Sequence, residues 1–459
     1  MRFSHRQPPD TIIIMRPFLH TALRLILTLV ALGSSCLLTV SAAETKVAPI
    51  ATPGAANSAE WMRTVYLGLV RESIIPADPR VIASAALAKL AALAPERVLP
   101  LPAWFGVDAE RDAAWLAERV MDLPPPWLVL DAMARAAATA HVLLRSPQRR
   151  EGIGALMAGK PRAALGFNLH PLADGRLVVF DVFPGASAEA SGLRAGDVLH
   201  RIDGVPVARV DVFLLNALPA GAELKLDIER AGRPATIVLR LIQADVPSVE
   251  SRLLDGGIGY VVVRWFARSD NAERNTAGLA RRAFIALAAQ DARGLIIDLR
   301  SALGGSGEVA MASALCDGDV MYSIQQPLSA PVRHVKRKGE RIWPDRPIVI
   351  LVNEHTVSSG EELALSLREL AHAKIVGRTT GGGLTEMSFL PLADGYGLTI
   401  PNGVVLGPIS GKGQPGHAIK PDIEVPNPSI AELLNGRDPQ LEAARAVLAN
   451  NPALRGAKP

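Results

Sequence analysis

Ser358 stands where a predicted strand gives way to a predicted helix, a position suited to a nucleophile. The apolar run 347–352 is typical of a buried strand, a short loop follows it, and a helix is predicted from about 360 to 371. At a helix N-terminus, free amides point outward and the helix dipole is positive. The amide of Ser359 could therefore stabilise the oxyanion formed when Ser358 attacks a carbonyl group. The plainer alternative is that one of these serines only caps the helix.

A glycine-rich loop after a second predicted strand supplies a partner for such a serine. The apolar run 294–298 is followed by Arg300 and then by Gly304 and Gly305. Glycines let backbone amides approach a reacting carbonyl group, so Gly305 is a candidate donor to the oxyanion. The alternative is an ordinary glycine turn before a helix near 306–316.

A serine hydroxyl is a poor nucleophile until a positioned base takes its proton. His355 lies three residues before Ser358, but reaching the hydroxyl within one short loop is geometrically awkward. Lys374 stands just before a predicted strand, where a solvated charge at the strand end is the simpler interpretation. Cys316 has apolar neighbours and is typical of a buried thiol rather than a nucleophile.

The elements that must position these residues fall into three stretches that differ in their predicted secondary structure. From 59 to 146 apolar residues recur at helical spacing, and one helix is predicted over 127–144. From about 161 to 242 short alternating strands are separated by glycine turns. From about 250 onward strands and helices alternate, and the strands are apolar throughout, which predicts a parallel α/β core.

The middle stretch resembles a PDZ domain. The resemblance rests on the run 184–199 (PGASAEASGLRAGDVL) and on the RIDG sequence at 201–204. It implies that a loop grasps a terminal carboxylate through its backbone amides while the peptide adds as a strand at the sheet edge. The implied loop is Leu165, Gly166, Phe167, Asn168 and Leu169. The alternative is that the loop's two large apolar residues simply fill the core; the implied partners are the C-termini of proteins or peptides.

The α/β stretch resembles the carboxyl-terminal processing, or tail-specific, proteases. Three motifs carry the resemblance: the strand and loop that end at Gly305, the segment 351–362 around Ser358, and the run 376–383 (VGRTTGGG). The resemblance implies Ser358 as the nucleophile and the amides of Gly305 and Ser359 as the oxyanion hole. The best-known members place a lysine 25 residues after the nucleophile as the general base, and this chain has Gly383 there.

Glycine at that position makes the tricorn-like branch, which uses a histidine as the base, the better match. The resemblance then implies His141, just after a predicted helix and upstream of the PDZ stretch, although Ala140 replaces the small acidic or polar residue that usually precedes it. The supporting acid of that branch would fall near Gln414 and is missing. Glu386 is the best local substitute, with an exposed strand residue as the alternative interpretation.

Together these features predict a multidomain α+β protein with an N-terminal helical region, a β-barrel-like PDZ domain and an α/β peptidase core of the crotonase or ClpP type. The predicted boundaries are 1–42 for a signal peptide, 59–146 for the helical domain, 161–242 for the PDZ domain, 250–428 for the peptidase core and 429–459 for a C-terminal helical tail.

The N-terminus predicts export. Arg16 and Arg24 precede the apolar run 25–40, and the small residues 41–43 suit cleavage by a signal peptidase. An uncleaved anchor is the alternative, but this run falls short of the roughly 20 residues that span a bilayer. We therefore expect a periplasmic or secreted protein with no stable membrane span after cleavage. Residues 1–42 hold four arginines and one acid, which is most of the net charge of +4, so no basic surface for nucleic acid is expected.

The leading hypothesis is a serine endopeptidase that cleaves exported proteins near their C-termini after capture by the PDZ domain. No group of Cys, His and acidic residues has metal-ligand spacing, and no cofactor is implied. The alternative is a catalytically lapsed protein that binds peptides or other ligands on the same fold. The missing lysine, Ala140 and the missing C-terminal acid all favour that alternative.

Overall fold

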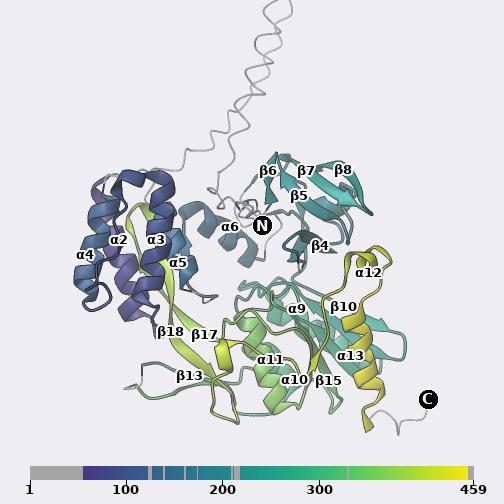
Figure 1. Ribbon diagram of the computed structural model, residues 1–459. Coiled ribbons are helices and arrows are strands. Elements are labelled where there is room, and N and C mark those ends of the chain that lie inside the picture. Colours follow the sequence, from purple (N-terminus) through teal and green to yellow (C-terminus); the bar gives the residue numbers. More distant parts are fainter. Residues whose placement is uncertain are drawn as a thin grey trace, which may run out of the picture.

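The computed structural model describes residues 55–121, 127–137, 140–159, 162–172, 174–207, 210, 215, 218–327 and 330–452. The predicted signal peptide lies outside these ranges. No helix within them is long and apolar enough to cross a bilayer. Figure 1 shows a group of helices, a small sheet domain and a larger mixed core, and the predicted α+β fold class is confirmed.

The N-terminal region is helical because its apolar residues recur on one face of each helix and polar caps begin the helices. The carboxylate of Asp78 accepts the amides of Arg80 and Val81 at the start of one helix, and Asp108 caps another in the same way. The helices are α2 (Ala55–Leu67), continued by a π-helical turn (Gly68–Glu72), α3 (Pro79–Leu93), α4 (Ala109–Val120), α5 (Trp127–Ala136) and α6 (Pro147–Met157).

The helix predicted over 127–144 is wrong at its C-terminal end. Helix α5 ends at Ala136, and strand β1 (Leu143–Arg145) pairs antiparallel with β18 (Gly397–Leu406). The side chains of Leu144 and Leu398 lie in the same buried cluster as the N-terminal helices. Pairing with a strand more than 250 residues away thus overrides the local helical pattern, and it leaves His141 in the turn between α5 and β1.

The PDZ domain is an antiparallel sheet of strand order β3-β4-β5-β7-β8, in which β3 is an edge strand. A short helix, α7 (Ser187–Ala190), packs its buried Ala188 into the domain's core, as the PDZ-like run predicts. The strands are β3 (Phe167–Pro171), β4 (Leu177–Val182), β5 (Val198–Ile202), β6 (Val205–Pro206), β7 (Glu223–Arg230) and β8 (Arg233–Arg240), while β2 (Arg162–Ala163) pairs with β9 (Gln243–Ala244).

The main sheet of the core has the order β10-β11-β12-β15-β16-β19, and all its neighbours after β10 are parallel. Strands β12 and β15 are buried along their whole length, which explains their continuous apolar sequence. The elements are β10 (Val249–Leu254), β11 (Ile258–Val263), α9 (Thr276–Ala289), β12 (Gly294–Asp298), α10 (Glu308–Leu315), β15 (Ile348–Val352), α11 (Ser359–Leu370), β16 (Lys374–Gly377) and β19 (Ile423–Glu424).

A second, antiparallel sheet, which was not predicted from the sequence, joins the core to the N-terminal helices. Its order is β1-β18-β13-β14, with β17 also paired to β18. One end of β18 packs among the N-terminal helices through Leu398 and Ile400. The helical region therefore shares a hydrophobic core with the peptidase region. The remaining strands are β13 (Val320–Gln325), β14 (Arg333–Lys336) and β17 (Thr385–Pro391).

The C-terminal segment covers one face of the main sheet. It contains α12 (Ile430–Leu434) and α13 (Pro439–Ala449), and α13 buries Ala444 and Leu448 against β12, β15 and β16. Arg300, 3% exposed, donates to Asp298 at 2.9 and 2.6 Å and to Asp438 at 2.9 and 2.7 Å. One buried guanidinium thus ties the end of β12 to the start of α13.

We expect Arg300→Met to lower the free energy of unfolding by about 3–5 kcal/mol, because it leaves the buried Asp298 carboxylate without its counter-ion. Denaturant unfolding measures this. Arg437→Met is the matched control, since Arg437 makes exposed pairs with Glu432 and Glu442 on the same segment; its midpoint should barely move. Equal midpoints for the two variants would contradict a central role for the Arg300 network.

Candidate active site

Ser358 lies between β15 and α11, as predicted, and its backbone is strained. Its φ and ψ are 55° and −122°, a region that non-glycine residues rarely adopt. Such a conformation costs on the order of 1–3 kcal/mol and persists only where surrounding contacts enforce it. The side chain is half-buried, and the strained turn sets it at the N-terminal end of the helix.

The contact that enforces this turn is the fully buried carboxylate of Glu361. Its Oε2 accepts the amides of Ser358 at 2.9 Å and Gly383 at 2.7 Å, while its Oε1 accepts the amide of Gly382 at 3.1 Å and the hydroxyl of Thr380. Burial raises the pKa of Glu361 to about 7, although the hydrogen bonds from Thr380 and the backbone amides favour the ionised form. One side chain thereby fixes both the nucleophile turn and the glycine loop.

Gly383 is the position where the resemblance to the tail-specific proteases would place a lysine. A Cβ atom there would lie 3.0 Å from Ser358 N, 3.0 Å from Glu361 Oε2 and 3.2 Å from His141 Nε2. These separations are shorter than ordinary van der Waals contact. The imidazole of His141 therefore borders the space in which a side chain at 383 would begin, and Ser358 N borders the same space.

His141 is held by a hydroxyl group. Its Nδ1 lies 2.7 Å from Thr385 Oγ1, and the side chain is 6% exposed. With the ring proton on Nδ1 donated to Thr385, Nε2 keeps a free lone pair on the side of Gly383. Burial lowers the pKa of His141 to about 4, the Thr385 contact works against this, and Arg145 lowers it slightly. The imidazole is thus neutral at pH 7 and able to accept a proton.

Glu386, the predicted supporting acid, does not lie at the imidazole. Its carboxylate accepts from Arg333 and, at 3.3 Å, from Gln326 Nε2. Successive residues of strand β17 point to opposite faces, so a Thr385 that faces His141 turns Glu386 away. Thr385 was not predicted from the sequence, and the alternation of strand β17, which sends neighbouring side chains to opposite faces, was the signal that could have separated it from Glu386.

The two predicted oxyanion loops meet at Ser358. A Cβ atom on Gly304 would lie 2.8 Å from Ser358 Cβ, and one on Gly305 (φ 135°) would lie 2.1 Å from Phe266 O, so neither position accepts a larger residue. The Ser359 hydroxyl donates to Gly305 O at 3.1 Å and joins the loops. Within the described part of the chain, the N–H groups of Gly305 and Ser359 donate to no other group. They remain available to a substrate oxygen.

The predicted carboxylate loop leads into the edge strand of the PDZ sheet. Leu165 and Phe167 are buried in the domain's core, and Gly166 has φ 83° with Ala186 Cβ 2.3 Å from where its own Cβ would be. Asn168 and Leu169 continue along β3, whose outer edge pairs with none of the described strands. The loop therefore fills the core and also leaves an edge open, and its capture of a carboxylate stays a prediction.

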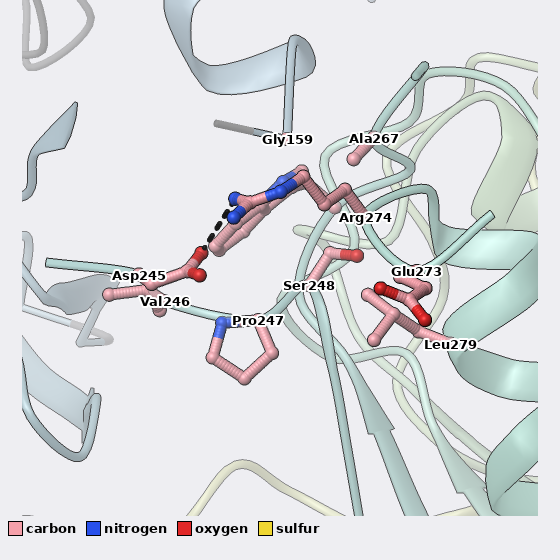
Figure 2. A pocket seen from close by; sticks show the side chains of 10 residues that line it. Gly159, Asp245, Val246, Pro247, Ser248, Ala267, Glu273, Arg274 and Leu279 are labelled. Carbon is pink, nitrogen blue, oxygen red and sulfur yellow. Dashed lines mark hydrogen bonds and ion pairs between the residues drawn. The ribbon is translucent and has the colours of Figure 1, made fainter. Parts of the chain in front are cut away.

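The other sequence candidates lie away from the hydroxyl. Lys374 is exposed at the start of β16, and Cys316 is buried, which raises its thiol pKa to about 11. The His355 ring stacks on His170 of the PDZ domain. A cavity of about 280 Å³ lies where the PDZ domain joins the core (Figure 2), and Asp245 and Arg274 pair beside it at 3.3 Å. No predicted catalytic residue lines that cavity.

Two family profiles match the chain. Residues 257–425 match Peptidase family S41, and residues 155–229 match the PDZ domain. The chain thus carries a region similar to Peptidase family S41 after a region similar to a PDZ domain. The predicted recognition of a PDZ-containing processing protease is confirmed, and the protein is a serine peptidase. Whether it uses a Ser/His or a Ser/Lys mechanism does not follow from the match.

The curated relatives of this serine peptidase carry related names. The chain is 29% identical over 348 residues to the "C-terminal processing peptidase, chloroplastic" of Tetradesmus obliquus, which covers 67% of this chain and 73% of that protein. It is 27% identical to the "Carboxy-terminal processing protease CtpA" of Bacillus subtilis (strain 168), over 62% of this chain and 58% of the relative. Part of each relative thus has no counterpart in the match.

A solved structure shares the fold of this chain over most of its length. Mature CPAF, solved in complex with lactacystin, superposes with a TM-score of 0.51 at 13% sequence identity. The superposition covers 88% of this chain and 99% of CPAF. At that identity the likeness shows the fold alone.

We expect Glu361→Gln to lower kcat roughly 10- to 100-fold with little change in KM. An amide supplies a single acceptor oxygen and turns its NH₂ group toward N–H donors, which leaves buried amides unpaired at about 1–3 kcal/mol each. Glu362→Gln is the matched control: burial, with Glu308 and Glu361 nearby, raises the pKa of Glu362 well above its usual value, so a neutral amide imitates it. Steady-state kinetics and melting temperatures compare the two, and equal losses of kcat would contradict the positioning role of Glu361.

The imidazole of His141 should titrate near pH 4 rather than near its ordinary value of about 6.5. It stays neutral at pH 7 and becomes charged only as the pH falls through about 4. A histidine-selective NMR titration should show one ring signal with this low midpoint, and His141→Ala should remove that signal. If the signal lost in His141→Ala titrates near 6.5, the imidazole is not buried as described.

Proposed function

We propose that this serine peptidase cleaves protein chains near their C-termini through a Ser358–His141 pair, in the manner that the names of its relatives indicate for them. The observation that carries the proposal is the position of His141 Nε2. This nitrogen lies 3.2 Å from the place where a Cβ atom on Gly383 would stand, and Ser358 N lies 3.0 Å from the same place. A neutral imidazole beside that place would take over the role of the lysine that the chain lacks there.

In the proposed reaction His141 Nε2 accepts the proton of the Ser358 hydroxyl as Oγ attacks the scissile carbonyl carbon. The N–H groups of Gly305 and Ser359 bind the negative oxygen of the tetrahedral intermediate. The proton on Nε2 passes to the leaving amine, and an acyl-enzyme ester remains on Ser358. Water, deprotonated by the same nitrogen, then hydrolyses the ester and frees the serine.

The PDZ domain supplies the proposed preference for chain ends. The free outer edge of β3 can pair with an extended peptide, and the loop from Leu165 to Leu169 at its start offers backbone amides to a terminal carboxylate. The apolar run 25–40 behind Arg16 and Arg24 supports export, so the substrates would be exported proteins.

One observation favours the catalytically lapsed alternative: a hydroxyl group, not a carboxylate, holds Nδ1 of His141. A hydroxyl stabilises the imidazolium less than a carboxylate does, so the base is weak. A C-terminal peptide library separates the two functions. Cleavage of peptides with a free carboxylate supports the peptidase, whereas binding of these peptides without cleavage supports the lapsed protein.

A serine-directed phosphonate probe should label the purified protein, and Ser358→Ala should abolish the labelling. His141→Ala should slow labelling and peptide cleavage by about 10²- to 10⁴-fold because the proton acceptor is gone. Ser251→Ala, at an exposed serine on β10, is the control and should label normally. Labelling that survives Ser358→Ala removes Ser358 from the mechanism, and unchanged rates in His141→Ala remove the proposed base.

A further inference from the structure

The PDZ domain packs against both loops that form the oxyanion hole. Phe183, just after β4, lies in one buried cluster with Trp265 of the core and with Leu303, the residue before Gly304. Asp181 of β4 pairs with Arg264 of the core at 3.2 Å. The domain is therefore a part of the wall behind the active site.

The contact with the nucleophile loop, residues 353–358, is a stack of three rings. His170 of β3 lies between Phe180 of β4, with ring centroids 3.9 Å apart, and His355 of the nucleophile loop, with centroids 4.2 Å apart and planes inclined by 15°. His170 is 2% exposed. Neither of these histidines takes part in the proposed reaction.

Asn353 makes the contact specific. Its Oδ1 accepts the backbone N–H of His355 at 3.0 Å, so its Nδ2 must be the group that faces His170. Nδ2 lies 3.2 Å from His170 Nδ1 and donates to it. The hydrogen bond from the wholly buried Asn353 therefore requires the neutral form of His170 in which Nδ1 is an acceptor.

Protonation of His170 would break this arrangement. A proton on Nδ1 would point at the Asn353 NH₂ group, and the positive ring would face Arg300, whose guanidinium lies 5.0 Å from the Phe180 ring on the same stack. Burial, then His355 and Arg300, hold the pKa of His170 well below its usual value. Burial also lowers the pKa of His355, against the effect of Glu354.

We propose that His170 is a positioning residue that the PDZ domain supplies to the peptidase core: by stacking on His355 and accepting the Asn353 amide it fixes the loop that ends at Ser358, and its protonation in acid releases that loop. The proposal rests on Ser358 being the nucleophile. If so, the position of the PDZ domain against the core, and any shift of β3, affects the rate at which Ser358 reacts.

The charged groups around the stack agree with release in acid rather than in base. Arg300 stands on the far side of Phe180, and its charge is already matched by Asp298 and Asp438. On the loop, Glu354 accepts from Asn427 at 2.7 Å and lies 3.8 Å from Arg378. These three carboxylates thus pair with other groups, and none of them makes a hydrogen bond to His170, although Glu354 Oε2 is buried without a hydrogen-bond partner.

A double-mutant cycle on His170→Ala and His355→Ala tests the coupling. Each single variant should lower kcat about tenfold with KM little changed, and the double variant should be no worse than either. His355→Phe should keep kcat within about twofold, because it preserves the stack while it removes the two ring nitrogens, of which Nε2 is buried without a partner. His200→Ala, at an exposed PDZ histidine, is the control. Additive losses, or a loss in His355→Phe equal to that in His355→Ala, would overturn the proposal.

A readout independent of cleavage keeps this test separate from the proposed function. Hydrogen–deuterium exchange of the peptide that covers 353–358 should be faster in His170→Ala than in the wild type at pH 7.5. Because the pKa of His170 is held well below its usual value, acidification to about pH 4 should raise loop exchange, corrected for its intrinsic pH dependence, in the wild type and not in His170→Ala. If exchange is the same in both proteins at both pH values, the proposal fails whether or not the protein cleaves peptides. If the exchange differs while the wild type cleaves nothing, only the proposed function fails.

Discussion

The buried carboxylate of Glu361 is the constraint on which the rest of the site depends. It takes the amide of Ser358 from one loop and those of Gly382 and Gly383 from another, so neither loop can move alone. The strained turn at Ser358 exists because this acceptor lies beneath it. The same carboxylate sets the distance from the serine to His141, because the imidazole rests against the glycine loop that Glu361 fixes.

Glycine at 383 has a structural consequence as well as a chemical one. In this chain the proposed base, His141, comes from the N-terminal region, in the turn between α5 and β1, and a hydroxyl on β17 holds it. Among the described strands, β1 pairs with β18 alone. The helical region would thus contribute a functional group to the proposed site, and it shares its hydrophobic core with β18.

Local motifs could be predicted from the sequence, and long-range pairings could not. Ser358, Gly305 and the alternating strands of the core carry their signals within a few residues, so the α/β core and the PDZ sheet were predictable. The pairing of Leu143 with Thr399 joins residues more than 250 positions apart, and no local sequence pattern predicts it. Glu386 was predicted as the substitute for a missing supporting acid, whereas the alternation along β17 places the hydroxyl of Thr385 at the ring.

The contact between the PDZ domain and the nucleophile loop bears on how Ser358 is positioned. Ser358, Glu361 and His141 all belong to the core and the helical region, yet the loop that ends at Ser358 has its other side against a ring from β3. A loop clamped at one end by Glu361 and at the other by Asn353 and His170 has little freedom left. Removing the second clamp would leave the hydrogen bonds of Glu361 intact and still widen the range of positions open to the hydroxyl. A domain whose edge strand is open to a peptide therefore also bears on the geometry of the nucleophile.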